Sequence, residues 1–488
     1  MTQAHESWDK PWKRWPGQRY ADAPAPSAEE REKIKAREAQ ERDRAREARA
    51  RDPRPNILFV FSDQQMAQAL SCAGNRWVNT PHMDRLADEG VRFAQCYCVA
   101  PVSGPSRAAL MTGRLPHENG VVFNGESPRP ELPNFGQTFR AAGYATVYSG
   151  KWHLPNSYPQ GDDAIPGFDQ INRPKDPRNK HGLGDVNDFG FAFDADFFLR
   201  YAAPQIGIPW LYTVSLHNPH DICQFAMRKP RKHRNLDLYP PLPSNFEIDP
   251  EEVDFLRIGR ESKSTHIEMA PSRPWDGDQW RAYIQAYYRL VEQVDRALGY
   301  ILDALDESGQ ADNTLVVFAS DHGEGCGAHR WPCKLALYEE CVRVPLILRY
   351  PGRIPAGRVD DTSLTSLLDL YPTFCDFAGF APPPVRGQSL KPAIEDPRAA
   401  WRDFVPAQIA AYRGDEHQRH GRMLRTARYK YNAYDIGARR EELYFLEADP
   451  GETRNLARDG AHASALTEHR ARLRAWLAET GDTFAVPE

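Results

Sequence analysis

The stretch Pro55-Asn-Ile-Leu-Phe-Val-Phe-Ser-Asp63 indicates the fold class of this chain. Its apolar residues follow one another without a polar interruption and end at Ser62 and Asp63, which is typical of a strand buried on both faces of a parallel sheet. Three later runs have the same form. They span residues 144–148, 208–216 and 314–318, and polar residues follow each of them.

Helical stretches at residues 83–90 and 280–305 lie between these predicted strands. Strands that alternate with helices predict an α/β fold with a mostly parallel central sheet flanked by helices. In such sheets the active site lies just past the carboxyl ends of the strands. We therefore expect the functional residues where the four apolar runs end.

Three regions are predicted along the chain. Residues 1–53 form a charged N-terminal extension, residues 54–385 the catalytic domain, and residues 386–488 a smaller C-terminal α/β domain. The extension is expected to hold a helix after Ser27, and it is either an exposed arm or an arm that embraces a second subunit of a homo-oligomer. Residues 155–275 are rich in Pro, Gly, Asp and Asn, and are predicted to be loops that form walls of the substrate site.

Composition excludes several classes of protein. The 488 residues carry a net charge of −5, which argues against a nucleic-acid partner. No apolar run approaches the length of a membrane span, and no signal sequence is seen at the N-terminus, so we expect a cytoplasmic protein, or an exported one whose signal has been removed. The eight cysteines are scattered and are expected to be mostly free thiols.

One segment carries the strongest chemical signal, Pro101-Val-Ser103-Gly-Pro105-Ser-Arg107, followed by Thr112-Gly-Arg114. Pro105 is suited to the first turn of a helix, which would place Ser103 at the helix N-terminus, where backbone amides and the helix dipole attract an anion. Arg107 would lie one turn further along the same face. Taken alone, the segment is also compatible with a capping serine beside a surface arginine.

This segment resembles the signature of the sulfatase family, a branch of the alkaline-phosphatase superfamily, in which a Cys or Ser is followed at fixed spacing by Pro, Ser and Arg and then by Thr-Gly-Arg. The resemblance extends over about residues 54–456. It implies that a formylglycine-generating maturation enzyme oxidises Ser103. The hydrated aldehyde of formylglycine would then be the nucleophile.

A metal site is expected at two neighbouring strand ends. Asp63 and Gln64 follow the first predicted strand, and Asp321 and His322 follow a later one. Oxygen ligands suit Ca²⁺, while the histidine is also acceptable to Mn²⁺ or Zn²⁺. The resemblance places one divalent metal among these four residues and the residue derived from Ser103, with Ca²⁺ expected and Mn²⁺ as the alternative. Many relatives carry Asp where Gln64 stands and Asn where His322 stands.

The resemblance also assigns the residues that handle the sulfate group. Lys151 and Lys334 would bind it, and Arg107 would stabilise charge on its oxygens. His153, in the Lys-x-His motif, would assist either the formylglycine hydroxyl or the collapse of the sulfated intermediate.

Two other histidines are candidates for contact with the substrate. His220 is the expected general acid, because a near-neutral pKa suits that task and because Pro219 before it matches the family's Pro-His element better than His217 does. His329 either touches the substrate or has a structural role.

The combined motifs predict a sulfatase that hydrolyses an organic sulfate ester, with a carbohydrate sulfate as the preferred substrate class. Two alternatives stay open. One is a phosphonate monoester or phosphodiester hydrolase of the same superfamily, a branch that generally lacks the pair formed here by Lys151 and His153. The other is a catalytically silent binding protein in which Ser103 stays unmodified.

Overall fold

The computed structural model describes residues 27–155, 165–171, 184–227, 238–261, 269–413 and 417–488. At its centre is an eight-stranded sheet with the strand order β10-β2-β9-β7-β1-β6-β4-β5. The strands are β1 (Asn56–Asp63), β2 (Val91–Phe93), β4 (Ala145–Gly150), β5 (Asp169–Gln170), β6 (Trp210–Pro219), β7 (Thr314–Ser320), β9 (Leu346–Arg349) and β10 (Arg358–Asp360).

Five neighbouring strands of this sheet, β7, β1, β6, β4 and β5, run parallel to one another. Strand β9 is antiparallel to β7 and β2, and β10 is parallel to β2. The four apolar runs of the sequence are β1, β4, β6 and β7. The predicted α/β fold with a mostly parallel sheet is confirmed.

Alternation along β1 explains why helices cover both faces of the sheet. Ile57, Phe59 and Phe61 belong to one buried cluster, and Leu58 and Val60 belong to another. Successive side chains of a strand point to opposite faces, so a strand that is apolar throughout needs a packed layer on each side.

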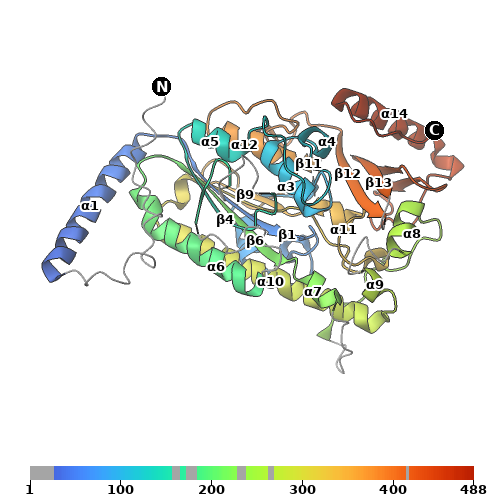
Figure 1. Cartoon of the computed structure of the whole chain (residues 1–488), viewed down its shortest axis with the longest axis horizontal. Helices are drawn as coiled ribbons and strands as arrows, with labels where there is room; N and C mark the ends of the chain where they lie inside the picture. Colours follow the sequence, from blue (N-terminus) through green and yellow to red (C-terminus); the bar gives the residue numbers. More distant parts are fainter. Residues whose placement is uncertain (1–26, 156–164, 172–183, 228–237, 262–268, 414–416) are drawn as a thin grey trace.

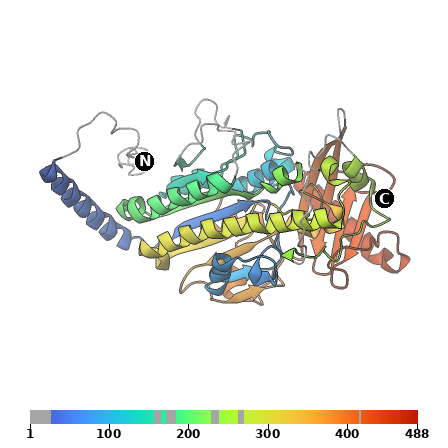
Figure 2. The same ribbon diagram turned by 90° about the horizontal axis from the view of Figure 1, so that it is seen from below.

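The helices supply these two layers. Helices α2 (Pro81–Asp88), α6 (Gly184–Phe197) and α10 (Gly277–Glu307) cover one face. Helices α3 (Ser103–Thr112), α5 (Phe135–Ala141) and α12 (Leu370–Phe377) pack on the other. Figures 1 and 2 show α6 and α10 side by side along the sheet. Shorter elements connect the layers: α4 (Pro116–Asn119), α7 (Ile222–Met227), α8 (Asp254–Glu261), α9 (Met269–Ser272), α11 (Glu339–Val342), α13 (Lys391–Glu395), and a small sheet of β3 (Cys96–Tyr97), β8 (Arg343–Val344) and β11 (Thr365–Ser366).

Helix α6 contradicts the prediction that residues 155–275 are loops. Its glycine and aspartate residues have weak helix propensity, and this hid the helix. Phe191, Ala192, Ala195 and Phe198 nevertheless recur at helical spacing and are buried against the sheet, so tertiary packing decides the conformation. Residues 156–164, 172–183, 228–237 and 262–268 of the same region lie outside the described residues.

The C-terminal part contains strands and a helix, as expected of the predicted α/β domain, and the strands form an antiparallel sheet on which the helix packs. Its strands are β12 (Phe404–Arg413), β13 (His417–Thr426), β14 (Tyr429–Tyr434) and β15 (Glu441–Phe445), and the helix is α14 (Ala463–Thr480). Leu473 and Leu477 of α14 pack with Leu424 and Tyr431 of the sheet. The boundary near residue 385 stays a prediction.

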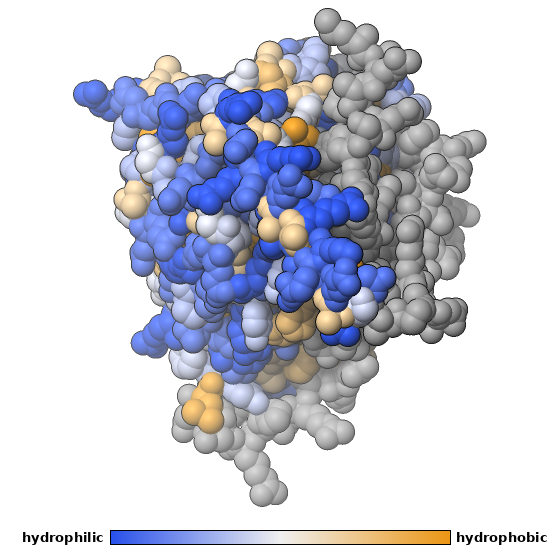
Figure 3. Space-filling model, turned by 90° about the vertical axis from the view of Figure 1, so that its left-hand side faces the viewer, coloured by the Kyte–Doolittle hydropathy of each residue, from blue (hydrophilic) through white to orange (hydrophobic). Residues whose placement is uncertain are grey.

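Helix α1 (Ala28–Ala50) projects from one end of the molecule (Figure 1). Ser27 caps it, in a capping box with Glu30. Most of its residues are exposed, and only its last turns approach the core, where Ala45 is buried. The face of the molecule at this end is mostly hydrophilic (Figure 3). A homo-oligomer formed through this arm stays a prediction.

All eight cysteines are free. Among the described residues, none of the helices has the length and apolarity needed to cross a bilayer.

Candidate active site

The candidate active site lies where β1 and β7 end side by side. Asp63 is the last residue of β1, and Asp321 directly follows β7. Both carboxylates are fully buried. The backbone amide of Gln64 donates a hydrogen bond to Asp321 Oδ1 at 3.1 Å, which ties the two strand ends together. The parallel pairing of β1 with β7 therefore brings residues that are far apart in sequence into one place.

Ser103 is the first residue of α3, and it points at this strand edge. Its Oγ lies 2.9 Å from His322 Nε2 and 3.4 Å from Asp63 Oδ2. Pro105 occupies the first turn of α3. Ser103 thus lies at the N-terminus of a helix, as its position before Pro105 predicts. The helix dipole favours negative charge there.

Asp63, Asp321 and His322 form a group whose ligand atoms all lie within 4.8 Å of one another. His322 Nδ1 lies 2.9 Å from the carbonyl oxygen of Gly323, and this contact leaves the lone pair of Nε2 facing the carboxylates and Ser103. A second hydrogen bond of this kind commonly orients a histidine ligand. Burial lowers the pKa of His322, which favours the neutral, ligating form. The donor set therefore fits a divalent cation.

Positive charge surrounds Asp63. Lys151 Nζ lies 2.6 Å from Asp63 Oδ2, and Lys151 is itself buried. Burial alone would raise the pKa of Asp63, but Lys151, followed by His220, Arg107 and Lys334, holds it well below its usual value. Asp63 is consequently an anion that these groups stabilise.

Arg107 is held by protein groups. Its guanidinium is buried and donates four hydrogen bonds to protein acceptors: Asp63 Oδ2, Asp321 Oδ2, the Lys151 carbonyl oxygen and Ser215 Oγ. Arg107 therefore positions the two carboxylates, which the sequence could not reveal because the direction of a long side chain depends on tertiary packing. Its predicted action on the sulfate oxygens stays a prediction.

Gln64 connects the metal group to Lys334. Lys334 Nζ donates to Gln64 Oε1 at 2.6 Å, and Gln64 Nε2 donates to Glu324 Oε2 at 2.6 Å. Glu324 is buried, and its other oxygen accepts from Tyr283 Oη at 2.7 Å. Sequence reasoning missed Glu324 as a positioning residue, although it stands three residues after Asp321 in Asp-His-Gly-Glu.

Three histidines face the same charges. Burial lowers the pKa of His153 and His220 well below the usual value and that of His217 to about 3, and Lys151 strengthens each shift. His217 and His220 have ring centroids 5.3 Å apart. His153 Nδ1 is buried without a hydrogen-bond partner among the described residues, and its φ of 62° is unusual outside glycine. Lys334, His153 and His220 are partly exposed, so they mark the open side of the site.

His329 lies in a different cluster, with Glu340 and Glu452. Its ring stacks on Tyr338 at 3.9 Å and its backbone amide donates to the Asn245 carbonyl. Burial lowers its pKa to about 3. These contacts favour the structural role of the two that the sequence left open.

That second cluster also contains a buried lysine. Lys430 contacts Glu339 Oε1 at 3.2 Å and forms an ion pair with Glu452. Lys430 comes from β14, and Glu339 comes from α11 in the larger part of the chain. The cluster therefore connects the C-terminal sheet to the rest of the molecule.

Residues 55–380 match the family model described as Sulfatase, and residues 327–479 match the one described as N-sulphoglucosamine sulphohydrolase, C-terminal. The chain belongs to the sulfatase family. It is thereby a sulfuric ester hydrolase, as predicted.

Two curated sulfatases of Bacteroides thetaiotaomicron are among the relatives of this chain. One is a delta 4,5-hexuronate-2-O-sulfatase, 31% identical, with 88% of this chain and 90% of that protein covered. The other is an N-acetylglucosamine-6-O-sulfatase, also 31% identical, with 83% of this chain and 82% of that protein covered.

Solved sulfatase structures share the fold. A 2-O GAG sulfatase superposes with a TM-score of 0.77 at 30% identity, covering 89% of this chain and 95% of that one. A protein solved with its substrate D-glucosamine-2-N,6-O-disulfate superposes with a TM-score of 0.73 at 26% identity, covering 88% of this chain and 99% of that one.

Proposed function

We propose that this sulfatase removes sulfate from a carbohydrate sulfate ester, with position 103 as the nucleophile. The observation that carries the proposal is the placement of Ser103 at the start of α3, 2.9 Å from His322 and beside the Asp63–Lys151 ion pair. The carbohydrate class is supported by the two curated relatives, whose names specify sulfated sugars.

The proposal requires two groups that the chain must acquire. Formylglycine formed from Ser103 by a maturation enzyme would supply a hydroxyl nucleophile, and a divalent cation would supply Lewis-acid charge beside it. Asp63, Asp321 and His322 would hold the cation, with Gln64 Oε1 as the fourth protein ligand. We favour Ca²⁺ because three of these four residues offer oxygen, and Mn²⁺ is the alternative because of the histidine.

The residues around position 103 then have distinct tasks. Lys151 and Lys334 place positive charge where the sulfate oxygens gather, and such preorganised charge is commonly the largest catalytic contribution. Arg107 keeps both carboxylates in place through its hydrogen bonds. His153, with its unpartnered Nδ1, is suited to accept a proton from the nucleophile.

His220 is the proposed general acid. Burial and the charges of Lys151 and Lys334 lower its pKa in the free protein. A bound sulfate ester brings negative charge that offsets the two lysines, so binding favours the protonated form. His220 would then donate that proton to the departing alcohol oxygen.

Mass spectrometry tests the nucleophile. We expect the peptide that contains Ser103, taken from protein made in its native host, to be lighter by two hydrogens. An intact serine in fully active protein would contradict the formylglycine mechanism.

Rates on matched substrates test the reaction class. We expect turnover of sulfated monosaccharides to exceed turnover of an aryl phosphodiester, and a preference for the diester would identify a phosphonate or phosphodiester hydrolase instead. His220→Ala should slow the reaction with an alkyl leaving group about 10²-fold or more, while the neighbouring control His217→Ala should cost less.

A further inference from the structure

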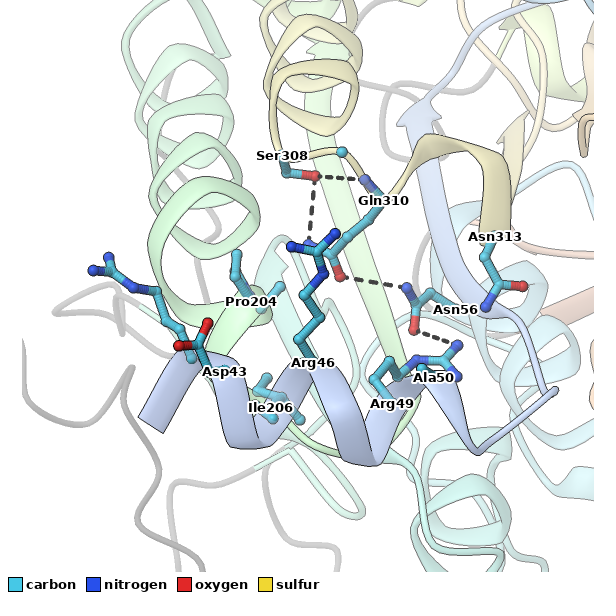
Figure 4. A pocket seen from close by; sticks show the side chains of 14 residues that line it. Asp43, Arg46, Arg49, Ala50, Asn56, Pro204, Ile206, Ser308, Gln310 and Asn313 are labelled. Carbon is cyan, nitrogen blue, oxygen red and sulfur yellow. Dashed lines mark hydrogen bonds between the residues drawn. The ribbon is translucent and has the colours of Figure 1, made fainter. Parts of the chain in front are cut away.

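A second cavity lies between α1 and the core, at the end of the central sheet where strand β1 begins (Figure 4). Its volume is about 660 Å³, within the range of small-molecule sites. Asn56, the first residue of β1, lies in its wall, whereas Asp63 ends the same strand at the active site. Seven residue steps of roughly 3.3 Å separate these two ends by about 23 Å, so the cavity is distinct from the active site.

Three arginines of α1 line this cavity: Arg42, Arg46 and Arg49. Their spacing of four and three residues puts them on one face of the helix. Among the residues whose side chains the structure describes, no carboxylate forms an ion pair with any of the three. Basic residues on the earlier turns of α1 do have such partners: Lys33 pairs with Glu29, Lys35 with Glu32, and Arg37 with Glu41. The described lining of the cavity contains these three arginines and one acidic residue, Asp43, so its net charge is positive.

Arg49 is fixed by neutral groups instead of an acid. Its Nη1 donates to the Asp52 carbonyl oxygen at 2.6 Å, and its Nη2 donates to the Arg54 carbonyl oxygen and to Asn56 Oδ1. Its Nε is buried and has no partner among the described residues. The guanidinium is therefore preorganised, and its charge is not balanced by a carboxylate that contacts it.

The facing wall is lined by the uncharged residues Ser308, Gln310 and Asn313. Gln310 Oε1 accepts from Trp210 Nε1 at 3.0 Å, and the Ser308 hydroxyl donates to the Leu305 carbonyl oxygen at 2.6 Å. Asn313 Oδ1 accepts from Tyr350 Oη at 2.9 Å, which leaves Asn313 Nδ2 as the amide donor on this wall. Figure 4 shows the Arg46 side chain extending from α1 toward Ser308 and Gln310. Pro204 and Ile206 add apolar surface. The cavity thus has arginine forks on one wall, and polar groups with a small apolar patch on the other. This lining matches a ligand that has an anionic end and a polar, partly apolar body.

We propose that this cavity binds a small monoester of sulfate or phosphate carried on a sugar-like body. Arg42 and Arg46 contact the oxyanion, because arginine forms charge-assisted, frequently bidentate hydrogen bonds with such groups. The amide nitrogen of Asn313 contacts a hydroxyl of the body. The site makes the junction between the arm and the core responsive to an anionic ligand, and it does not depend on the chemistry at Ser103.

Calorimetry on the full chain tests the site. Ser103→Ala serves as the background in every sample, so that no probe is hydrolysed. The probes are glucose 6-phosphate, glucose 6-sulfate and uncharged glucose. We expect the two esters to bind and glucose not to bind, with affinity that falls as salt rises. The double variant Arg42→Gln/Arg46→Gln should weaken ester binding at this site about tenfold or more, the loss expected for charge-assisted hydrogen bonds.

The matched control is Arg44→Gln, which changes an exposed arginine of the same helix that does not line the cavity. It should bind both esters as the background does. Binding of one ester only, lost in the double variant, would support the site and identify its ligand. Equal binding in the background and the double variant, equal loss in Arg44→Gln, or no ester binding at all would overturn the proposal. Thermal unfolding without ligand verifies that each variant is folded.

Discussion

Around Asp63 and around Glu452 the protein buries the same kinds of side chains, namely carboxylates, a lysine and a histidine. In the Glu452 cluster, Lys430 contacts two glutamates, and the histidine ring is stacked on Tyr338. In the Asp63 cluster, the histidine nitrogen faces the carboxylates and Ser103.

The difference lies in where the donors are directed. In the second cluster the charged side chains pair with one another, and these pairs join two parts of the chain. The first cluster directs Lys151 and Arg107 at Asp63 and Asp321, and Lys334 reaches the same group through Gln64, so its cations face the proposed substrate site as well as the carboxylates. A list of residue types cannot separate the two clusters, but the direction of their donor atoms can.

The largest expected effect comes from Asp63→Asn. It removes a proposed metal ligand and the carboxylate that Lys151 and Arg107 share, so we expect kcat/KM on a sulfated sugar to fall at least ~10³-fold. Steady-state kinetics measure this. The matched change in the other cluster, Glu452→Gln, should leave kcat/KM of the folded protein within about threefold. Similar losses in the two variants would contradict the distinction between the clusters.

Lys430→Met should act on stability instead. It leaves the ionised Glu339 buried without its cation, and breaking a buried ion pair commonly costs ~3–5 kcal/mol. Urea unfolding measures the loss in the free energy of unfolding. The exposed control Lys35→Met, which breaks a surface pair with Glu32, should change it by less than about 0.5 kcal/mol. A loss below about 1 kcal/mol for Lys430→Met would show that the cluster does not hold the two parts together.

Glu324→Gln should have a smaller effect on activity. Glu324 accepts a hydrogen bond from Gln64 Nε2 and so fixes which atom of Gln64 faces Lys334 and the metal group. Loss of an outer partner of this kind commonly costs about 10–100-fold in metal affinity or activity. Calcium titration followed by an activity assay measures both. The control is Glu340→Gln, because the Glu340 side chain contacts Asn245. Equal losses of activity and calcium affinity in the two variants would contradict the role of Glu324 in orienting Gln64.

The smallest effect concerns pH. Burial raises the pKa of Glu452 to about 8. Burial would also raise the pKa of Glu339, but Lys430 holds it at about 2. The single lysine therefore balances only one of the two carboxylates. A glutamate with an unfolded pKa of 4.5 and a raised folded pKa stabilises the fold below pH 4.5, and this contribution is lost as pH rises toward 8.

Glu452→Gln replaces the protonated acid with a neutral amide of similar shape. The free energy of unfolding of the unmodified protein should therefore fall more steeply between pH 5 and pH 8 than that of the variant. Urea unfolding at several pH values measures both slopes. If the free energy of unfolding changes with pH equally in both proteins, the group that loses its proton between pH 5 and pH 8 is not Glu452.

The sequence predicted much of the candidate site, because its determinants are local or follow from strand order. Pro105 indicated that Ser103 begins a helix, and apolar runs that end in Asp63 and Asp321 predicted that these carboxylates share one edge of a parallel sheet. The free cysteines and the mixture of strands and a helix in the C-terminal part also agreed with the sequence patterns.

Other features depend on contacts that no local pattern encodes. Helix α6 forms from residues of weak helix propensity because the sheet buries its apolar face. The guanidinium of Arg107 contacts both buried carboxylates, and Glu324 reaches Gln64 across 260 positions of sequence. Such pairings are decided by tertiary packing.

The burial of Ser103 has a consequence for timing. Its side chain is 0% exposed and is closed over in part by His322, which lies 219 positions later in the chain. At synthesis rates of about 5–20 residues per second, roughly 10 to 45 seconds pass between the appearance of the two residues on the ribosome. A maturation enzyme would have this interval to reach position 103 on the nascent chain. We expect it to convert an unfolded peptide that contains Ser103 and to leave the folded, unmodified protein unchanged, which mass spectrometry of both products would reveal.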